Sequence, residues 1–561
     1  MSELLVKWEA LRKQDAEIDA VFGFLKKGDE QDATYKHLEF GTAGMRGLLG
    51  PGSNRMNKYV VRRATRGFAK YLLEYGDKSR KMAVAIAYDN RHFSREFALD
   101  TARYLASFNI ESYIFSSLRA TPELSFSVRE QHCVGGIMIT ASHNPREYNG
   151  YKVYDETGCQ LVPDKIAKVI AYIDEIEDEL TLSYQLTSEQ ETYVHLVDQE
   201  LDQKYTDRVK AISYQKVASP GKLKVVFTPQ HGTAYPLLAT LLEEKGYDLY
   251  LVEEQCSPDP DFSHTESPNP EEHKAYTKAI ELAKKVDADL ILSTDPDADR
   301  MGVVVKHHHD YVFVTGNQGG SILQEYIYSA LKEHHEMPEH PVMFNTVVTS
   351  DLGEVIARDY GVDCEKTLTG FKYIGNKIDG YDQTKSKQFV FGYEESYGYL
   401  LKPFVRDKDA FQACSILAEA AAYYQQSQKT LIDVLNDLYA KYGTYLETQV
   451  SLTLTGESGV SKIQAILNGF RANQPTKLGD IKVVASEDFL SGVHQGEERW
   501  TLDFPRENVL KYFLEDGSWV AIRPSGTEPK CKFYFCIKAE SEAACTAKFN
   551  RINAEIQQRI A

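Results

Sequence analysis

The stretch Gly135-Gly136-Ile137-Met138-Ile139-Thr140-Ala141-Ser142-His143-Asn144-Pro145 joins a strand-like apolar run to a polar turn. The apolar run predicts a buried strand, and the turn that follows it would present the hydroxyl of Ser142. A serine oxygen is a weak nucleophile until a neighbouring base removes its proton, and His143 and Lys152 are candidates for that role. The pattern is typical of a covalent phosphoryl carrier, although a turn that merely caps a strand would look the same.

Strand-like and helix-like runs alternate on both sides of this stretch. Residues 83–88, 114–115 and 136–139 fit strands, and residues 101–107 fit a helix between them. The same alternation starts again at Lys222 and at Pro341, which predicts three similar α/β units with mixed sheets. We expect a helix and a connector in residues 174–203. An alternating pattern in residues 443–461 leads into a different C-terminal unit.

A second motif is the acidic run Asp295-Pro296-Asp297-Ala298-Asp299-Arg300, which follows a strand-like run over residues 288–294. Alternate residues of an extended backbone project to one side, so the three carboxylates would converge and require a cation. Oxygen ligands that share a phosphate favour magnesium. An EF-hand would need Gly where this chain has Arg300 and Glu where it has Lys306, so only a solvated acidic turn remains as the alternative.

A third motif, Gly392-Tyr393-Glu394-Glu395-Ser396-Tyr397-Gly398-Tyr399, follows another strand-like run and precedes Arg406-Asp407-Lys408-Asp409. Its carboxylates and hydroxyl can accept hydrogen bonds from several sugar hydroxyls, which indicates a polyol site. Adjacent glutamates on a strand face opposite ways, which argues against a cooperating pair for glycoside hydrolysis. A plain loop is the simpler alternative.

A fourth motif, Arg523-Pro524-Ser525-Gly526-Thr527-Glu528-Pro529-Lys530, lies between strand-like runs over residues 518–522 and 532–537. A guanidinium, two hydroxyls and a glycine in one turn can hold a phosphate dianion by side chains and backbone N–H groups. The forked contact of arginine suits a phosphate that is gripped without being cleaved. An ordinary hairpin turn is the alternative.

In this order, the four motifs resemble those of the alpha-D-phosphohexomutases, the family of phosphoglucomutases and phosphomannomutases. The resemblance runs from about Phe40 to about Ile537 and is strongest to the bacterial alpha-phosphoglucomutase branch. It implies four domains around a central cleft that holds the active site, the last being a smaller α+β domain. We expect boundaries that give the ranges 1–205 (phosphoserine loop), 206–318 (metal binding), 319–445 (sugar binding) and 446–561 (phosphate binding).

The resemblance also implies roles for individual residues. The loop from Phe40 to Gly47 is similar to the family loop whose arginine faces the phosphoserine, and Thr369-Gly370-Phe371-Lys372-Tyr373 is similar to its sugar-orienting loop. The implied metal ligands are Ser142, Asp295, Asp297 and Asp299, and the implied catalytic residues are Ser142, Arg46, His143, Lys152 and Arg300. The implied substrate-binding residues are Thr369, Gly370, Lys372, Glu394, Ser396, Lys408, Arg523, Ser525, Gly526 and Thr527.

The implied activity is that of an isomerase that acts as an intramolecular phosphotransferase. Phosphorylated Ser142 would give its phosphoryl group to a sugar hydroxyl, and a bisphosphate would return its other phosphate to the enzyme. We expect interconversion of glucose 1-phosphate and glucose 6-phosphate, with one Mg²⁺ per active site and glucose 1,6-bisphosphate as intermediate and activator. A pentose or mannose phosphate within the same family is the alternative, because one hydroxymethyl group gives little discrimination.

Two other classes compete with this interpretation. In a haloacid-dehalogenase-like phosphatase, Asp295 would be the nucleophile and Asp297 the acid/base, but Asp299 stands where Thr or Val is usual. A non-catalytic sugar-phosphate-binding protein would leave Ser142, the aspartates and Arg46 without a purpose.

Composition agrees with a globular protein that binds small molecules. The chain has 561 residues, 42% of them hydrophobic, and a net charge of −18, which argues against nucleic acid as a partner. Eight cysteines without a Cys-x-x-Cys pair indicate reduced thiols, and we expect a cytoplasmic protein with no membrane segment and no leader, either monomer or dimer. His307-His308-His309 fits a hairpin tip better than a metal site.

Overall fold

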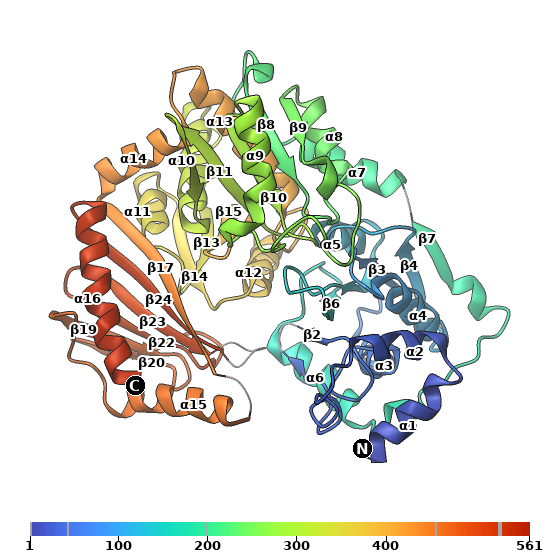
Figure 1. Ribbon diagram of the computed structural model, residues 1–561. Coiled ribbons are helices and arrows are strands. Elements are labelled where there is room, and N and C mark those ends of the chain that lie inside the picture. The colour runs from blue at the N-terminus through green and yellow to red at the C-terminus, as the bar shows by residue number, and fades with distance from the viewer. Residues whose placement is uncertain (1–2, 42–43, 198, 455–456, 525–529, 561) are drawn as a thin grey trace. The chain divides into compact units, whose positions relative to one another are not determined.

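The computed structural model is shown in Figure 1 and describes residues 3–41, 44–197, 199–454, 457–524 and 530–560. Its contacts divide the chain into two compact units. Unit 1 contains residues 1–319, 338–341 and 370–430, and unit 2 contains residues 320–337, 342–369 and 431–561. The third α/β segment of the chain therefore contributes to both units.

The N-terminal part of unit 1 is a seven-stranded mixed sheet with the order β1-β2-β6-β5-β3-β4-β7. The strands are β1 (Phe40–Gly41), β2 (Gly44–Leu48), β3 (Lys81–Tyr88), β4 (Glu111–Phe115), β5 (Cys133–Ile139), β6 (Tyr148–Asp155) and β7 (Val194–Val197). Its longer helices are α3 (Lys58–Tyr75), α4 (Ser94–Ala106), α5 (Thr121–Glu130) and α6 (Pro163–Asp174), preceded by α1 (Glu3–Arg12) and α2 (Ala16–Val21). Every residue of β5 is buried, as expected for a strand covered on both faces.

Residues 174–203 differ in part from the expectation of a helix and a connector. The helix is present as the start of α7 (Gln199–Lys210), but strand β7 precedes it and pairs in parallel with β4. This edge strand has four residues, too few for an alternating pattern to be recognised, and its partner strand lies far back in the sequence.

A second sheet in unit 1 has the order β12-β11-β10-β8-β9. Its strands are β8 (Lys224–Thr228), β9 (Asp248–Leu251), β10 (Leu290–Thr294), β11 (Met301–His307) and β12 (Asp310–Val314), with helices α8 (Leu237–Glu244) and α9 (Thr277–Val286). Strands β8, β9 and β10 are parallel, whereas β11 is antiparallel to β10 and β12. His307 pairs with Asp310 across the β11–β12 turn, which confirms the predicted hairpin tip.

The third α/β segment contains α10 (Gly316–Glu333), β13 (Pro341–Thr346), α11 (Leu352–Asp359), β14 (Asp363–Thr367), α12 (Phe371–Thr384), β15 (Gln388–Glu394), β16 (Gly398–Leu400), α13 (Ala410–Gln425) and α14 (Leu431–Tyr442). Within unit 1, β15 and β16 form an antiparallel hairpin. Within unit 2, β13 and β14 are parallel, so this segment also mixes the two kinds of pairing.

The C-terminal part of unit 2 is an eight-stranded sheet in which the described pairs are antiparallel. It contains β17 (Thr444–Thr453), β18 (Lys477–Leu478), β19 (Ile481–Asp488), β20 (Val493–Gln495), β21 (Arg499–Thr501), β22 (Leu510–Leu514), β23 (Trp519–Pro524) and β24 (Lys530–Ala539). Helices α15 (Glu457–Ala472) and α16 (Glu542–Ile560) complete it. The mixed α/β sheets and this distinct α+β part confirm the predicted fold class.

The expected domain boundaries fall inside regular elements. Residues 205/206 lie in α7, 318/319 in α10 and 445/446 in β17, so these positions stay predictions. In the part of the chain that the structure describes, no helix combines the length and apolar character that crossing a bilayer requires.

Candidate functional site

Ser142 lies in the turn that begins where β5 ends. Its backbone has a φ of 50°, in the left-handed region that costs a non-glycine residue of order 1–3 kcal/mol, as is common at functional sites. The backbone N–H donates to Thr140 Oγ1 at 2.8 Å, and the side-chain Oγ donates to Asp295 Oδ2 at 2.7 Å. Ser142 is only 3% exposed, so its hydroxyl is held against the acidic run at the end of β10.

The carboxylates of Asp295, Asp297 and Asp299 converge, with one oxygen from each lying within 4.8 Å of the others. The prediction of convergence is confirmed, but the expected extended backbone is wrong. The segment after β10 is a turn in which Ala298 has a φ of 52°, and Asp295 Oδ1 accepts the N–H groups of Asp299 and Arg300 at 3.1 and 3.0 Å. The carboxylates therefore converge because the backbone folds around Asp295.

Three buried carboxylates in contact are costly unless a cation neutralises them. Burial and the charges of Asp299 and Asp297 raise the pKa of Asp295; for Asp297, burial acts in the same direction but Lys152 outweighs it and lowers the pKa. Asp297 Oδ1 and Asp299 Oδ1 are buried and accept no hydrogen bond from any described residue. An oxygen-only donor set with unused buried oxygens fits a hard divalent cation.

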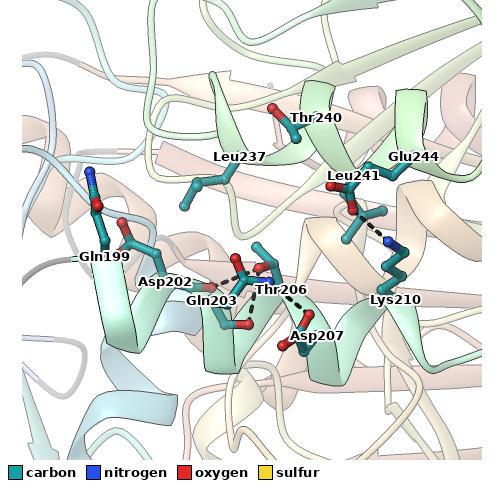
Figure 2. A pocket seen from close by; sticks show the side chains of 10 residues that line it. All are labelled: Gln199, Asp202, Gln203, Thr206, Asp207, Lys210, Leu237, Thr240, Leu241 and Glu244. Carbon is teal, nitrogen blue, oxygen red and sulfur yellow. Dashed lines mark hydrogen bonds and ion pairs between the residues drawn. The ribbon is translucent and has the colours of Figure 1, made fainter.

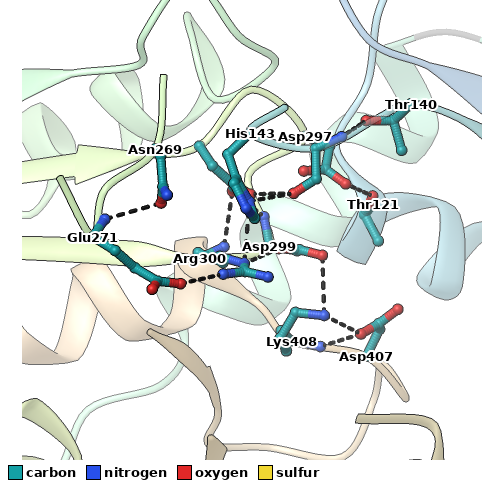
Figure 3. A network of polar contacts seen from close by, with 12 residues as sticks. Thr121, Thr140, His143, Asn269, Glu271, Asp297, Asp299, Arg300, Asp407 and Lys408 are labelled. Carbon is teal, nitrogen blue, oxygen red and sulfur yellow. Dashed lines mark hydrogen bonds and ion pairs between the residues drawn. The ribbon is translucent and has the colours of Figure 1, made fainter. Parts of the chain in front are cut away.

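Three cationic side chains surround the aspartates: Lys152, Lys408 and Arg300. Figure 3 labels Lys408 and Arg300. Lys152, on β6, donates to Asp297 at 2.8 Å and lies 3.6 Å from Asp299. Lys408 lies 3.0 Å from Asp299, and Arg300 Nε lies 3.7 Å from the same side chain. Burial disfavours the charge of Lys152, but Asp297 and Asp299 outweigh burial and raise its pKa, so this side chain is an ammonium.

His143 differs from Lys152 in its protonation. Its Nδ1 lies 3.3 Å from Ser142 Oγ. Burial, with the charges of Arg300 and Arg46, lowers the pKa of His143 well below its usual value. A neutral imidazole beside the hydroxyl can accept a proton, which an ammonium cannot.

The structure adds residues that the motifs did not single out. Thr121, at the start of α5, donates its hydroxyl to Asp297 Oδ2 at 2.9 Å, and Glu271 accepts from Arg300 at 2.7 Å (Figure 3). Asn144 accepts from Arg46 at 2.9 Å. Asn144 lies inside the quoted serine motif and was available from the sequence, whereas no local pattern marks Thr121 or Glu271.

The predicted sugar-binding residues lie in two places. Glu394 and Ser396 lie at or just beyond the end of β15, whereas Thr369, Gly370 and Lys372 lie around the start of α12. Glu394 Oε1 accepts the N–H of Gly370 at 2.7 Å, and Gly370, directly after Thr369, has a φ of 122° that favours glycine. Burial raises the pKa of Glu394, and the positive charge of Lys408 offsets only part of this increase. Arg300 forms a β-bridge with Gly398. This bridge brings the turn over residues 295–299 against the β15–β16 hairpin that carries Ser396. Lys372 is buried in the first turn of α12.

Arg523 is placed at the end of β23, and its guanidinium donates to Glu507 Oε1 at 3.2 and 3.4 Å. The antiparallel pairing of β23 and β24 confirms the two strands that were expected on either side of the fourth motif. Ser525, Gly526 and Thr527 lie outside the described residues. Arg523 belongs to unit 2, whereas Ser142, the three aspartates, Lys152, Arg300, Glu394 and Lys408 all belong to unit 1.

A pocket of about 230 Å³ between α7 and α8 is separate from these residues (Figure 2). Lys210 and Glu244 in its lining form an ion pair at 2.7 Å, and Asp202 is held by Arg119. None of its lining residues is a candidate site residue: Gln199, Asp202, Gln203, Thr206, Asp207, Lys210, Leu237, Thr240, Leu241 and Glu244. This pocket therefore contains none of the residues that the motifs singled out.

Comparison with protein families gives four consecutive matches. Three are to the alpha/beta/alpha domains I, II and III described as phosphoglucomutase/phosphomannomutase, over residues 37–180, 203–308 and 315–442. The fourth is to the C-terminal domain of the same description, over residues 471–553.

Curated relatives and solved structures agree with these matches. Proteins named phosphoglucomutase from Staphylococcus epidermidis and Staphylococcus aureus are 39% and 38% identical over 528 residues, covering 93% of this chain and 94% and 93% of theirs. The fold is similar to a putative phosphomannomutase from Thermus thermophilus (TM-score 0.69, 20% identity, 93% of this chain and 99% of that one). It is also similar to the phosphoglucomutase parafusin from Paramecium (TM-score 0.69, 19% identity, 94% and 95% covered).

Proposed function

The chain belongs to the phosphoglucomutase/phosphomannomutase family, and from this membership we propose that it interconverts glucose 1-phosphate and glucose 6-phosphate through a phosphorylated Ser142. Family membership makes it an isomerase that transfers a phosphoryl group. The observation that carries the proposal is the contact of Ser142 Oγ with Asp295 at 2.7 Å, inside a buried aspartate cluster. Relatives named phosphoglucomutase that align over 93% of the chain support glucose phosphate as the substrate.

The proposed reaction has two transfers. In the first, the bond from phosphorus to Ser142 Oγ breaks as a bond from phosphorus to the free sugar hydroxyl oxygen forms, and the proton of that hydroxyl ends on Ser142 Oγ. The product is glucose 1,6-bisphosphate, whose other phosphate then passes to Ser142 and leaves the isomeric monophosphate. In the second transfer His143 Nδ1, 3.3 Å from Ser142 Oγ, accepts the proton of the Ser142 hydroxyl, and this proton ends on the sugar oxygen that loses its phosphate.

Charge neutralisation supplies most of the rate enhancement for phosphoryl transfer. We assign this role to Arg46, Lys152 and Arg300, since Lys152 and Arg300 already lie beside the aspartates. Asp295, Asp297 and Asp299, with the Ser142 phosphate, would hold one Mg²⁺, which when bound neutralises phosphate charge as a Lewis acid. Unused buried oxygens on Asp297 and Asp299 support this assignment.

Substrate recognition is assigned to the loops that the motifs of the sequence predict. Glu394 and Ser396 would accept hydrogen bonds from sugar hydroxyls, and the lysines Lys372 and Lys408 would face the sugar phosphate beside Thr369 and Gly370. Arg523, Ser525, Gly526 and Thr527 would grip the phosphate that does not react. Because all eight cysteines are free thiols, we also propose a reducing, cytoplasmic setting. Membership of the family supports small sugar phosphates as partners.

The decisive variant is Ser142→Ala, with Ser112→Ala as the matched control. Ser112 is also buried, and its Oγ has no hydrogen-bond partner among the described residues. With glucose 1-phosphate, Mg²⁺ and trace glucose 1,6-bisphosphate, Ser142→Ala should lose turnover by at least about 10³-fold while still binding glucose 6-phosphate. Ser112→Ala should turn over like the wild type. Wild-type turnover in Ser142→Ala would reject the proposal that Ser142 carries the phosphoryl group.

Two further measurements separate the competing functions. Parallel assays with mannose 1-phosphate and ribose 1-phosphate test the substrate, and a higher kcat/KM for ribose 1-phosphate would replace glucose in the proposal. The phosphoenzyme should be stable in acid, as a serine ester is. Release of its phosphate by hydroxylamine would instead indicate an acyl phosphate on Asp295.

A further inference from the structure

Arg91 lies beneath the Ser142 turn and was marked by none of the motifs. It follows β3 in the segment Asp89-Asn90-Arg91, and its side chain is 0% exposed. Its Nη1 donates to the carbonyl oxygens of Pro145 at 2.9 Å and Tyr148 at 3.1 Å. Its Nη2 donates to the carbonyl oxygens of Asn144 at 2.6 Å and Ser142 itself. One guanidinium therefore binds three carbonyl groups of the turn that carries the nucleophile and a fourth at the first residue of β6.

The orientation of Arg91 is itself fixed by its neighbours. Asp89 Oδ2 lies 3.3 Å from Arg91 Nε, and Asp89 Oδ1 accepts the N–H of Arg91 at 3.0 Å and the hydroxyl of Ser94 at 2.7 Å. The ring of Phe262 lies 5.2 Å from the guanidinium carbon. The buried carboxylate of Asp89 and the ring of Phe262 thus orient the guanidinium group of Arg91 toward the turn.

Such a clamp is needed because the turn has little regular hydrogen bonding of its own. Residues 140–147 form no helix or strand, and Ser142 is held in a left-handed conformation. Buried carbonyl groups without a donor would cost about 1–3 kcal/mol each, so loss of the guanidinium would drive the turn to rearrange. A displacement of about 1 Å at a reacting atom costs about 10²-fold in rate.

We propose that Arg91 is a positioning residue for phosphoryl transfer: by binding the carbonyl groups of Ser142, Asn144, Pro145 and Tyr148, it holds Ser142 Oγ in line with the aspartate cluster. Arg91 acts through the backbone, since the four groups that accept hydrogen bonds from its Nη1 and Nη2 are main-chain carbonyl oxygens. This inference rests on the proposed function of Ser142. It predicts that substitution of Arg91 changes kcat and leaves KM nearly unchanged.

The test compares Arg91→Lys and Arg91→Met with Arg62→Lys in the full-length enzyme. Arg62 is a matched control because it also pairs with an aspartate, Asp100, and donates to a carbonyl group, that of Leu182, but lies outside the site. Lysine keeps the charge and loses the planar fork, so Arg91→Lys should lower kcat at least about tenfold and Arg91→Met about 10²-fold. KM for glucose 1-phosphate should stay within about twofold, and Arg62→Lys should keep the wild-type kcat.

Hydrogen exchange provides a readout that needs no substrate. In both Arg91 variants, amides of residues 140–150 should exchange faster while those of β3 stay protected. If Arg91→Met does not accumulate as folded protein, Arg91→Lys and Asp89→Asn decide the question, with kcat expressed per folded molecule. A kcat within about twofold of the wild type, an unchanged exchange rate in residues 140–150, or an equal loss in Arg62→Lys would overturn the inference.

The same experiment distinguishes failure of this inference from failure of the proposed function. A wild-type enzyme that does not interconvert glucose phosphates rejects the proposed substrate, and a wild-type Ser142 that is never phosphorylated rejects the carrier. Neither result affects the comparison of hydrogen-exchange rates between the wild type and the Arg91 variants. That comparison reports whether Arg91 orders the turn.

Discussion

Thr121 offsets part of the free-energy cost of burying the Asp297 carboxylate. Its hydroxyl donates to Asp297 Oδ2 at 2.9 Å, and its backbone N–H donates to the Asp297 carbonyl oxygen at 2.9 Å. The carboxylate is thereby oriented from outside the metal site. Partners of this kind commonly change metal affinity about 10- to 100-fold when removed.

We therefore expect Thr121→Val to weaken Mg²⁺ binding about tenfold, because valine keeps the shape of threonine and removes the donor. The measurement is the Mg²⁺ concentration that gives half of the maximal thermal shift, with half-maximal activity as a second readout. Thr101→Val is the control, since Thr101 is equally buried and its Oγ1 has no hydrogen-bond partner among the described residues. Equal Mg²⁺ affinity in the two variants would contradict the role of Thr121.

At the scale of secondary-structure elements, α13 begins at a titratable cap. Asp409 Oδ1 accepts the N–H groups of Phe411 and Gln412 at 2.9 and 3.1 Å and the hydroxyl of Tyr205 at 2.9 Å. Burial raises the pKa of Asp409 to about 6 despite these hydrogen bonds. The folded-state pKa lies above the unfolded value, so the contribution of Asp409 to stability is complete at low pH and is lost as pH rises through 6.

Asn in place of Asp409 does not titrate, so the stability gap between wild type and Asp409→Asn should depend on pH. We expect the variant to be the less stable protein at pH 5 and the gap to narrow by about 1 kcal/mol by pH 7.5. Thermal midpoints of both proteins, measured across this range at constant ionic strength, test the prediction. A gap that is constant or widens as pH rises would show that Asp409 does not titrate in this way.

At the scale of the whole molecule, apolar side chains form separate cores. The seven-stranded sheet, the five-stranded sheet and the C-terminal sheet each pack against a hydrophobic cluster of their own. Division into several cores is expected for a chain longer than about 300 residues. Seven of the eight cysteines are buried, and Cys364 is partly exposed.

The burial of the cysteines predicts that thiol reagents modify the native protein slowly. Burial raises the pKa of Cys133 to about 12 and that of Cys364 to about 11, so few thiolates exist at neutral pH. A disulfide reagent such as Ellman's should therefore modify fewer than about one thiol per chain within minutes. In guanidinium chloride it should modify all eight. Rapid reaction of two or more thiols in the native protein would contradict the packing of these cores.

The sequence predicted the site best where motif and strand are contiguous. Ser142, Asp295, Glu394 and Arg523 each lie at or just beyond the end of a strand that an apolar run made recognisable. Convergence of the aspartates was also predictable, because three carboxylates within five residues must share a small volume. The turn that brings them together was not, because the left-handed conformation of Ala298 depends on its surroundings.

Contacts between distant segments came only from the folded chain. Thr121 and Asp297 are 176 positions apart, Lys152 and Asp297 are 145 apart, and Arg91 and Ser142 are 51 apart. A local pattern records which residue types occur and how an element begins and ends, so it marked the proposed nucleophile and the proposed metal ligands. Which donors satisfy them depends on how sheets and turns pack, since a hydrogen bond forms wherever folding brings two groups within about 3 Å, whatever their separation in the sequence.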